Sequence, residues 1–226
     1  MVYRRTSLMQ ERLADNRRRI LMAARQLIAQ GGFREASIAA VAREVGLSIG
    51  AIYRYFPSKA DLFVELLTEA VGREVQILRG IIDGPGSATD RLRAAVESFA
   101  SRALKGPHLA YAFIIEPTET EVEAARILYR RQFSDLFREI LRQGIRSGEF
   151  PRQSVDLSAA CIVGAFTEAL VRPVAPTAKP PHSRQLIRAI AEVCVRAAGS
   201  LPFTDARRLR ARRARASKES PPRSDR

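Results

Sequence analysis

Residue types that build metal sites and disulfides are scarce in this chain. Its 226 residues include two histidines, two cysteines and no tryptophan. His108 and His182 have no histidine or cysteine partner at metal-ligand spacing, so we predict neither a metal site nor a cofactor. Cys161 and Cys194 lie in separate apolar runs, which favours two buried thiols in a reducing cytoplasm; redox sensing is the less favoured alternative.

Long apolar runs and strand patterns are also missing. The first residues lack the apolar core of a signal peptide, and the longest apolar run, residues 157–171, is too short to span a bilayer. No segment alternates polar and apolar residues as a strand does, and no P-loop or dinucleotide-binding fingerprint occurs. We therefore expect an all-α protein that resides in the cytoplasm, without membrane contact.

The positive charge lies at the two ends of the chain. The net charge is +14, and residues 1–60 carry 11 Lys/Arg against 4 Asp/Glu. Residues 204–226 carry 9 against 3, whereas residues 61–203 carry 18 against 17. A basic end on a nearly neutral body is typical of a protein that binds a polyanion, although a basic surface can also be merely solvated.

Residues 37–59 read as two short helices joined at a glycine. Ser37 and Ser48 each precede a helical pattern as N-caps, and Gly46 supplies the left-handed conformation that ends the first helix. Four apolar residues at helical spacing predict the buried face of the first helix: Ile38, Val41, Ala42 and Val45. Two helices across such a turn form a helix-turn-helix, whose second helix can enter the major groove.

The second helix offers small residues that let the backbone approach DNA, followed by Tyr53 and Arg54, which can reach phosphates or base edges. Lys59 stands at the start of the next helix, where backbone N–H groups and the ammonium can meet a phosphate. The predicted DNA-binding residues are Ser37, Arg43, Ser48, Ile49, Gly50, Ala51, Tyr53, Arg54, Tyr55 and Lys59.

This motif resembles the DNA-binding domain of the TetR family of bacterial repressors. The matching residues, in family order, are Gly31, Gly32, Phe33, Ser37, Gly46, Ser48, Gly50, Ile52, Tyr53, Tyr55, Phe56, Ser58 and Lys59. The resemblance covers roughly the first third of the chain. It implies a double-stranded DNA operator as partner, a small-molecule inducer bound in the C-terminal domain, and a homodimer formed through the last two helices.

The remaining sequence predicts further helices and two flanking segments. We expect a flexible basic arm over residues 1–15, the helix-turn-helix domain over 16–60, a helical ligand-binding and dimerisation domain over 61–203, and a disordered basic tail over 204–226. A long helix beginning at Ser58 is predicted to join the two domains. The prolines predict a loop after residue 171, at Pro173, Pro176, Pro180 and Pro181. The tail could add non-specific DNA affinity or serve only solubility.

Aromatic residues between Phe99 and Phe166 are candidates for a ligand pocket, and a plain aromatic core is the equally favoured alternative. The candidate aromatic residues are Phe99, Tyr111, Phe113, Tyr129, Phe133, Phe137 and Phe166. The candidate polar anchors are Arg102, His108, Glu116 and Glu168.

The function that these patterns favour is a DNA-binding transcriptional regulator, in particular a repressor released by a ligand. One alternative is an architectural DNA-binding protein without an inducer. Another is a serine hydrolase, because residues 46–50 spell G-x-S-x-G around Ser48. That elbow requires a preceding strand, and the sequence predicts a helix there, so we expect no enzymatic activity.

Overall fold

The computed structural model describes residues 2–176 and 183–199, with side chains from residue 9 onward. Nine helices and no strands occur in these ranges, as predicted for an all-α chain. They are α1 (Val2–Gly31), α2 (Ile38–Val45), α3 (Ile49–Tyr55), α4 (Lys59–Ile82), α5 (Ala88–Lys105), α6 (Pro107–Ile114), α7 (Thr120–Ser147), α8 (Val155–Val174) and α9 (Ser183–Ala197). The predicted tail (204–226), His182, Pro180 and Pro181 lie outside the described residues.

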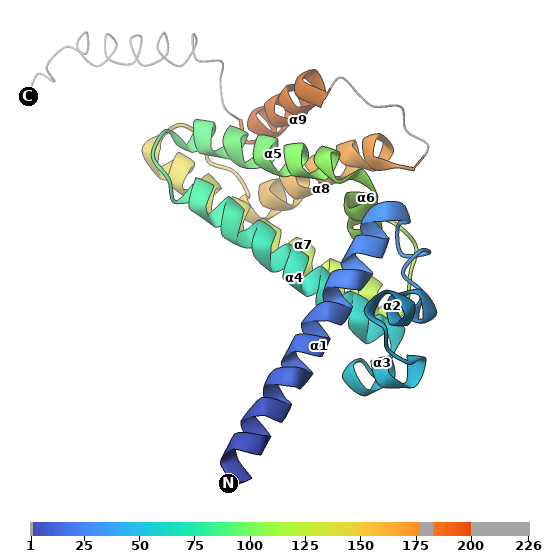
Figure 1. Cartoon of the computed structure of the whole chain (residues 1–226). Coiled ribbons are helices and arrows are strands. Elements are labelled where there is room, and N and C mark those ends of the chain that lie inside the picture. The colour runs from blue at the N-terminus through green and yellow to red at the C-terminus, as the bar shows by residue number, and fades with distance from the viewer. Residues whose placement is uncertain (1, 177–182, 200–226) are drawn as a thin grey trace, which may run out of the picture.

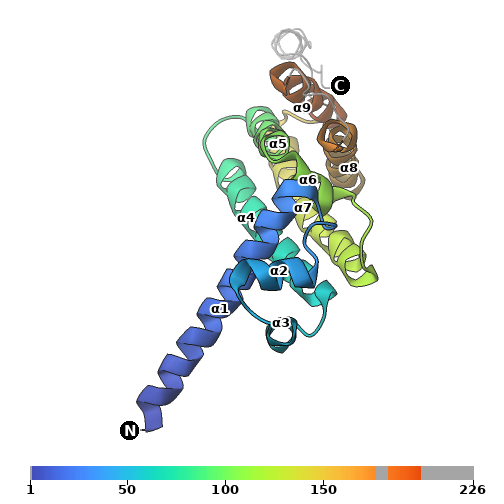
Figure 2. The same cartoon turned by 45° about the vertical axis from the view of Figure 1, so that its right-hand side comes forward.

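Helix α1 begins at Val2, so the structure describes residues 2–15 as helix where the sequence predicts a flexible basic arm. In both views the first half of α1 projects away from the rest of the molecule (Figures 1 and 2). Its polar sequence lacks the apolar stripe by which a helix is predicted from sequence. The helix continues through this stretch because no proline or glycine interrupts it before Gly31.

Helices α1 to α3 share one small core. Ile20, Ala24 and Ile28 of α1 are fully buried and pack with the apolar face of α2, as the helical spacing predicts. Polar contacts of α1 add to this packing. Arg19 Nη2 donates to the carbonyl of Val45 at 2.9 Å, which satisfies an orphan carbonyl at the end of α2.

Helix α4 links the small N-terminal unit to the body. It leaves the helix-turn-helix beside α1 and runs along α7 to the opposite edge (Figures 1 and 2). Helices α5 and α8 pack against α7, and α9 packs against α5 and α8, at the end of the molecule far from α3. The ring of Phe33, in the turn after α1, stacks on Phe63 of α4 with centroids 4.4 Å apart.

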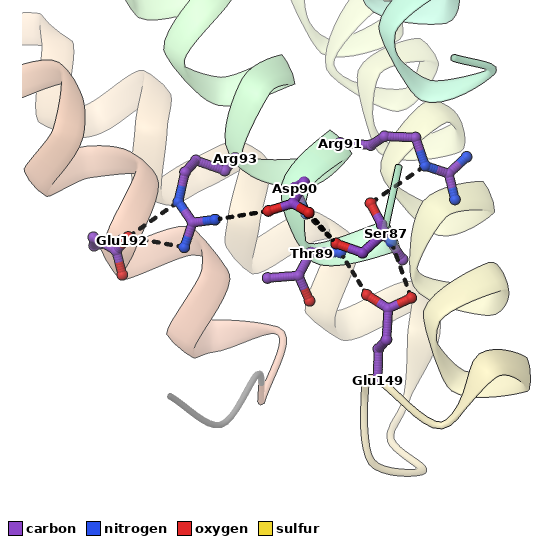
Figure 3. Close-up of polar contacts among 8 residues, drawn as sticks. Ser87, Thr89, Asp90, Arg91, Arg93, Glu149 and Glu192 are labelled. Carbon is purple, nitrogen blue, oxygen red and sulfur yellow. Dashed lines mark hydrogen bonds and ion pairs between the residues drawn. The ribbon is translucent and has the colours of Figure 1, made fainter. Parts of the chain in front are cut away.

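The first turn of α5 is closed by side chains from two segments. Ser87 Oγ accepts from the N–H of Asp90 at 3.0 Å, as an N-cap serine does. The carboxylate of Glu149 accepts from the N–H groups of Ala88 and Thr89 at 3.0 and 2.9 Å (Figure 3). Three of the N–H groups that a helix start leaves unpaired therefore have acceptors.

Helix α8 differs from its prediction in three respects. It is 20 residues long because Pro173 lies inside it rather than in a loop. By length and composition it could cross a membrane, contrary to the prediction, but this is weak evidence because its buried face packs against α7 and α9. Cys161 is exposed on its outer face, so the prediction of two buried thiols holds only for Cys194.

Candidate DNA-binding and ligand-binding sites

The helix-turn-helix has the capping geometry that its sequence predicts. Ser37 Oγ accepts from the N–H of Ala40, and Ser48 Oγ accepts from the N–H of Ala51, each at 3.1 Å. Gly46 has φ 69° and ψ 33°, and its N–H bonds the last turn of α2. A residue with a side chain is strained in that conformation, so glycine sets the sharp turn between the helices.

Most predicted contact residues are exposed to solvent. The exposed ones are Ser37, Arg43, Ser48, Ile49, Gly50, Tyr53 and Arg54. Ala51 faces inward and is only 7% exposed, and Tyr55 is half-buried because its hydroxyl accepts from Asn16 Nδ2 of α1 at 3.1 Å. The prediction that Ala51 contacts DNA is therefore wrong. Ala51 and Ile52 form the buried face of α3, and only the opposite face of this helix is exposed.

Lys59 does not point freely toward an anion at the start of α4. Its ammonium pairs with Glu119 at 3.1 Å and lies 5.0 Å from the centre of the Phe63 ring. Burial alone would raise the pKa of Glu119, but hydrogen bonds from Thr118, from a backbone N–H and from Lys59 hold it below its ordinary value. The ammonium of Lys59, which was predicted to meet a phosphate, is therefore paired with the Glu119 carboxylate of the C-terminal body.

Ser48 acts as the N-cap of α3, which is not the role of a hydrolase nucleophile. A helix precedes it and its hydroxyl caps α3, whereas a nucleophile elbow presents its serine after a strand. The described residues also contain no group of three metal-ligating side chains.

The C-terminal body contains a cavity of about 410 Å³ between α4, α5, α6 and α7. This volume lies in the range of small-molecule sites, which is roughly 300–1,000 Å³. Its apolar wall consists of Leu67, Ala70, Val71, Phe99, Ala103, Leu109, Ala110, Phe113, Ile114 and Phe133.

The cavity includes four of the seven predicted pocket aromatics, namely Phe99, Phe113, Tyr129 and Phe133. Tyr111, Phe137 and Phe166 do not line it. Phe137 and Phe166 are fully buried and pack on each other with ring centroids 5.4 Å apart, as in the plain-core alternative. Sequence spacing could not separate these two sets, because pocket and core residues occupy the same helical faces.

Of the predicted polar anchors, Arg102 alone lines the cavity. It binds Glu74 through three hydrogen bonds, from Nε to Oε1 at 2.8 Å and to Oε2 at 3.0 Å, and from Nη2 to Oε2 at 2.6 Å. The two charges therefore compensate each other inside the wall. His108, Glu116 and Glu168 do not line it.

A buried pair of charged residues connects the cavity wall to the helix-turn-helix domain. Glu116 and Arg126, each 7% exposed, are the only buried charged residues among those described. The Glu116 carboxylate accepts from the N–H of Phe33 at 2.9 Å. Arg126, which lines the cavity, donates to the carbonyls of Glu116 at 2.7 Å and of Ala112, and it pairs with Glu123.

Two details show how tightly this connection is built. Gly32 has φ +83°, and a Cβ there would lie 2.5 Å from a Glu116 oxygen, so the site admits only glycine. Arg126 Nε is the one buried side-chain nitrogen or oxygen without a partner in the described part of the chain. Sequence reasoning missed Arg126, since an arginine inside a helical pattern reads as exposed.

Comparison with known families decides the kind of protein. The model for bacterial regulatory proteins of the tetR family matches residues 20–66, and that for a Tetracyclin repressor-like C-terminal domain matches residues 85–170. The chain belongs to the TetR family. It is a DNA-binding transcriptional regulator, as its motif predicted.

Individual relatives agree with this assignment. The TetR-family chain is 25% identical over 152 residues to the fatty acid metabolism regulator protein of Bacillus subtilis, covering 66% of this chain and 78% of that protein. It is 40% identical over 62 residues to the repressor KstR of Mycolicibacterium smegmatis, 27% of this chain and 28% of that one. The structure of FadR from Bacillus subtilis with stearoyl-CoA has the same fold, with TM-score 0.69 and 23% identity over 78% of this chain and 96% of that one.

Proposed function

We propose that this regulator represses transcription by binding a palindromic operator as a homodimer, and that a ligand in the cavity releases it. Two copies of α3 would reach one face of the duplex about 34–36 Å apart, and the two-fold symmetry of the dimer implies a palindromic site. The exposed surface around Tyr53 and Arg54 supplies the groove and phosphate contacts. Such binding would place the protein on the nucleoid.

The observation that carries the ligand part of this proposal is the position of Phe113. Its ring lines the cavity and also packs against Phe33, with ring centroids 6.0 Å apart. Phe33 lies at the end of α1 and is buried against α4, so one ring separates the cavity from the helix-turn-helix domain. A ligand that displaces Phe113 would disturb this junction.

Arg126 offers a second route between the same two parts. It touches the cavity, and it holds the carbonyl of Glu116, whose carboxylate binds the N–H of Phe33. A shift of α6 relative to α7 would strain the hydrogen bond from Arg126 to the Glu116 carbonyl and the one from the Phe33 N–H to the Glu116 carboxylate. Because both partners are buried, leaving either one unpaired costs free energy, of order 1–3 kcal/mol per group.

Release requires that the ligand bind the conformation without DNA more tightly than the DNA-bound one, since a ligand with equal affinities shifts no equilibrium. We infer that α4 swings when the junction changes, because it runs from the helix-turn-helix along the cavity wall. A swing in each protomer would alter the spacing of the two α3 helices.

Helices α8 and α9 supply the proposed dimer surface. Small residues are exposed on α8, including Ala160, Gly164 and Ala169, and Leu157 on the same helix is 65% exposed. These helices lie far from α3, so two copies could pair there while both α3 helices face DNA (Figures 1 and 2). Close helix approach across small residues would cover the apolar side that α8 leaves open in one protomer.

Selection of bound fragments from genomic DNA by the full chain tests the operator proposal. Enriched fragments should share a palindrome, and Arg54→Ala should weaken binding to it by about tenfold or more. Arg142→Ala, which removes an exposed arginine of α7, serves as control and should bind normally. Recovery of fragments without a shared sequence would favour an architectural protein instead.

Ligand release is tested with stearoyl-CoA, the molecule bound in the Bacillus subtilis FadR structure. Adding it to the wild-type complex should free the selected duplex. Phe113→Leu should keep operator affinity while blunting this release, because it reduces the contact with Phe33. Equal release from both proteins would exclude Phe113 as the connection.

A further inference from the structure

The charges around the cavity are unusually one-sided. Its wall includes six cationic residues and a single acidic one, Glu74. The cations are Arg25, Arg73, Arg102, Lys105, Arg126 and Arg130. Two of them have carboxylate partners: Arg102 binds Glu74 of the wall, and Arg126 pairs with Glu123, which lies outside the wall.

The uncompensated cations are all exposed, which places them where the cavity opens to solvent. Arg25 and Lys105 have no carboxylate within ion-pair distance in the described part of the chain, and Arg73 reaches Glu69 only at 4.0 Å. The cavity therefore combines an apolar interior with a cationic mouth. That combination suits a ligand with an apolar body and an anionic end.

Arg25 and Arg73 form the part of this mouth where the two domains meet. Arg25 belongs to α1 and Arg73 to α4, yet they are close enough to act on each other electrostatically. Partial burial, followed by the repulsion from Arg73, lowers the pKa of Arg25, and Glu69 opposes this effect. The two guanidinium groups repel each other and lack a full counter-charge. An anion bound between them would reduce this repulsion.

We propose that the cavity binds an anionic amphiphile, whose apolar part lies against Phe99, Phe113 and Phe133 and whose anionic group lies between Arg25 and Arg73. This inference rests on the proposed ligand-released function and specifies the chemistry of that ligand. An anion in this position binds one guanidinium from each domain. It therefore favours a fixed position of α1 relative to α4, in addition to any effect on Phe113.

The anionic group can be the carboxylate of a free fatty acid or the phosphates of an acyl-CoA thioester. Calorimetric titration of the full chain with dodecanoate, dodecanoyl-CoA and uncharged dodecanol separates these sources. At least one anionic probe should bind about tenfold or more tighter than dodecanol, because a charge-assisted contact is worth more than burial of the chain alone. The advantage should shrink as salt is added.

Arg25→Gln and Arg73→Gln should each remove most of that advantage and leave dodecanol binding unchanged. Arg18→Gln is the matched control, since Arg18 is an exposed arginine of α1 outside the cavity wall. Thermal melting of each variant verifies that it folds. Equal affinity for dodecanol and the anions, equal losses in Arg18→Gln and Arg25→Gln, or no binding of any probe would each overturn the proposal.

These titrations contain no DNA, so their outcome is separate from that of the operator experiment. Binding of the anion without release of the operator would contradict the proposed release and leave the anion site standing. Release of the operator by an uncharged ligand, with no anion binding, would contradict the anion site alone.

Discussion

At the scale of single residues, the glycines and the cations have the most specific roles. Gly50 lies in the exposed first turn of α3, and a Cβ added there would meet nothing within 4 Å in the protein. Its lack of a side chain therefore serves no packing purpose within the protomer. We attribute it to the close approach of DNA that the helix-turn-helix requires.

Gly50→Ala should raise the free energy of unfolding by about 0.5–1 kcal/mol, because alanine is the better helix former, and should lower operator affinity. Gly72→Ala is the matched control: Gly72 is exposed within α4 and also has open space around its Cβ position. It should stabilise the fold similarly without affecting DNA binding. Chemical denaturation and fluorescence anisotropy with the selected duplex measure the two effects. Unchanged operator affinity in Gly50→Ala would place this turn away from DNA.

At the scale of elements, helix ends are stabilised by side chains from elsewhere in the chain. The N-terminus of α5 depends on Glu149, which follows α7 and reaches back over about 60 residues (Figure 3). Burial alone would raise the pKa of Glu149, but the N–H groups of Thr89 and Ala88 and the hydroxyl of Ser147 lower it below its ordinary value of 4.5.

This lowered pKa predicts a pH dependence of stability. The unfolded chain binds the proton more readily, so the stabilisation by Glu149 is complete above pH 4.5 and is lost as the pH falls further, through the lower folded-state pKa. Glu149→Gln should therefore reduce the free energy of unfolding at pH 7, by up to about 1 kcal/mol, with a smaller difference in acid. Exposed Glu44→Gln is the control. A difference that stays constant from neutral to acidic pH would contradict the role assigned to this carboxylate.

At the scale of the whole molecule, the arrangement places the proposed DNA surface and the proposed dimer surface at opposite ends, with the cavity between them (Figures 1 and 2). A signal from the cavity can reach α3 through the junction at Phe33 and through α4, which lines the cavity and begins directly after the helix-turn-helix. The dimer surface can stay fixed while this junction changes, which would let each protomer move its own α3.

The two cysteines provide a direct test of the dimer surface. Cys161 is exposed on α8 among the small residues, whereas Cys194 is buried and burial raises its pKa to about 11. A short bismaleimide should therefore link two full chains through Cys161 and give a covalent dimer on a denaturing gel. Cys161→Ser should abolish this product and Cys194→Ser should retain it. A monomeric mass in solution and no covalent dimer would exclude α8 as the interface.

Local sequence signals determined the helix-turn-helix: N-cap serines, Gly46 and the apolar spacing after Ser37 act over a few residues, so the structure reproduces them. The same kind of signal at Ser58 predicted the start of α4. The same signals did not predict the length of α1, because a polar helix without an apolar stripe has the same sequence pattern as a flexible segment.

Contacts between distant segments were decided only by the tertiary structure. Nothing near Lys59 indicates that Glu119 holds its ammonium, and nothing near Arg126 indicates its burial beside Phe33. Phe133 lines the cavity while Phe137, one helical turn later, lies in the core. The spacing along a helix predicts which face a residue occupies. Whether that face meets a cavity, a charge or another side chain depends on how the neighbouring helices pack.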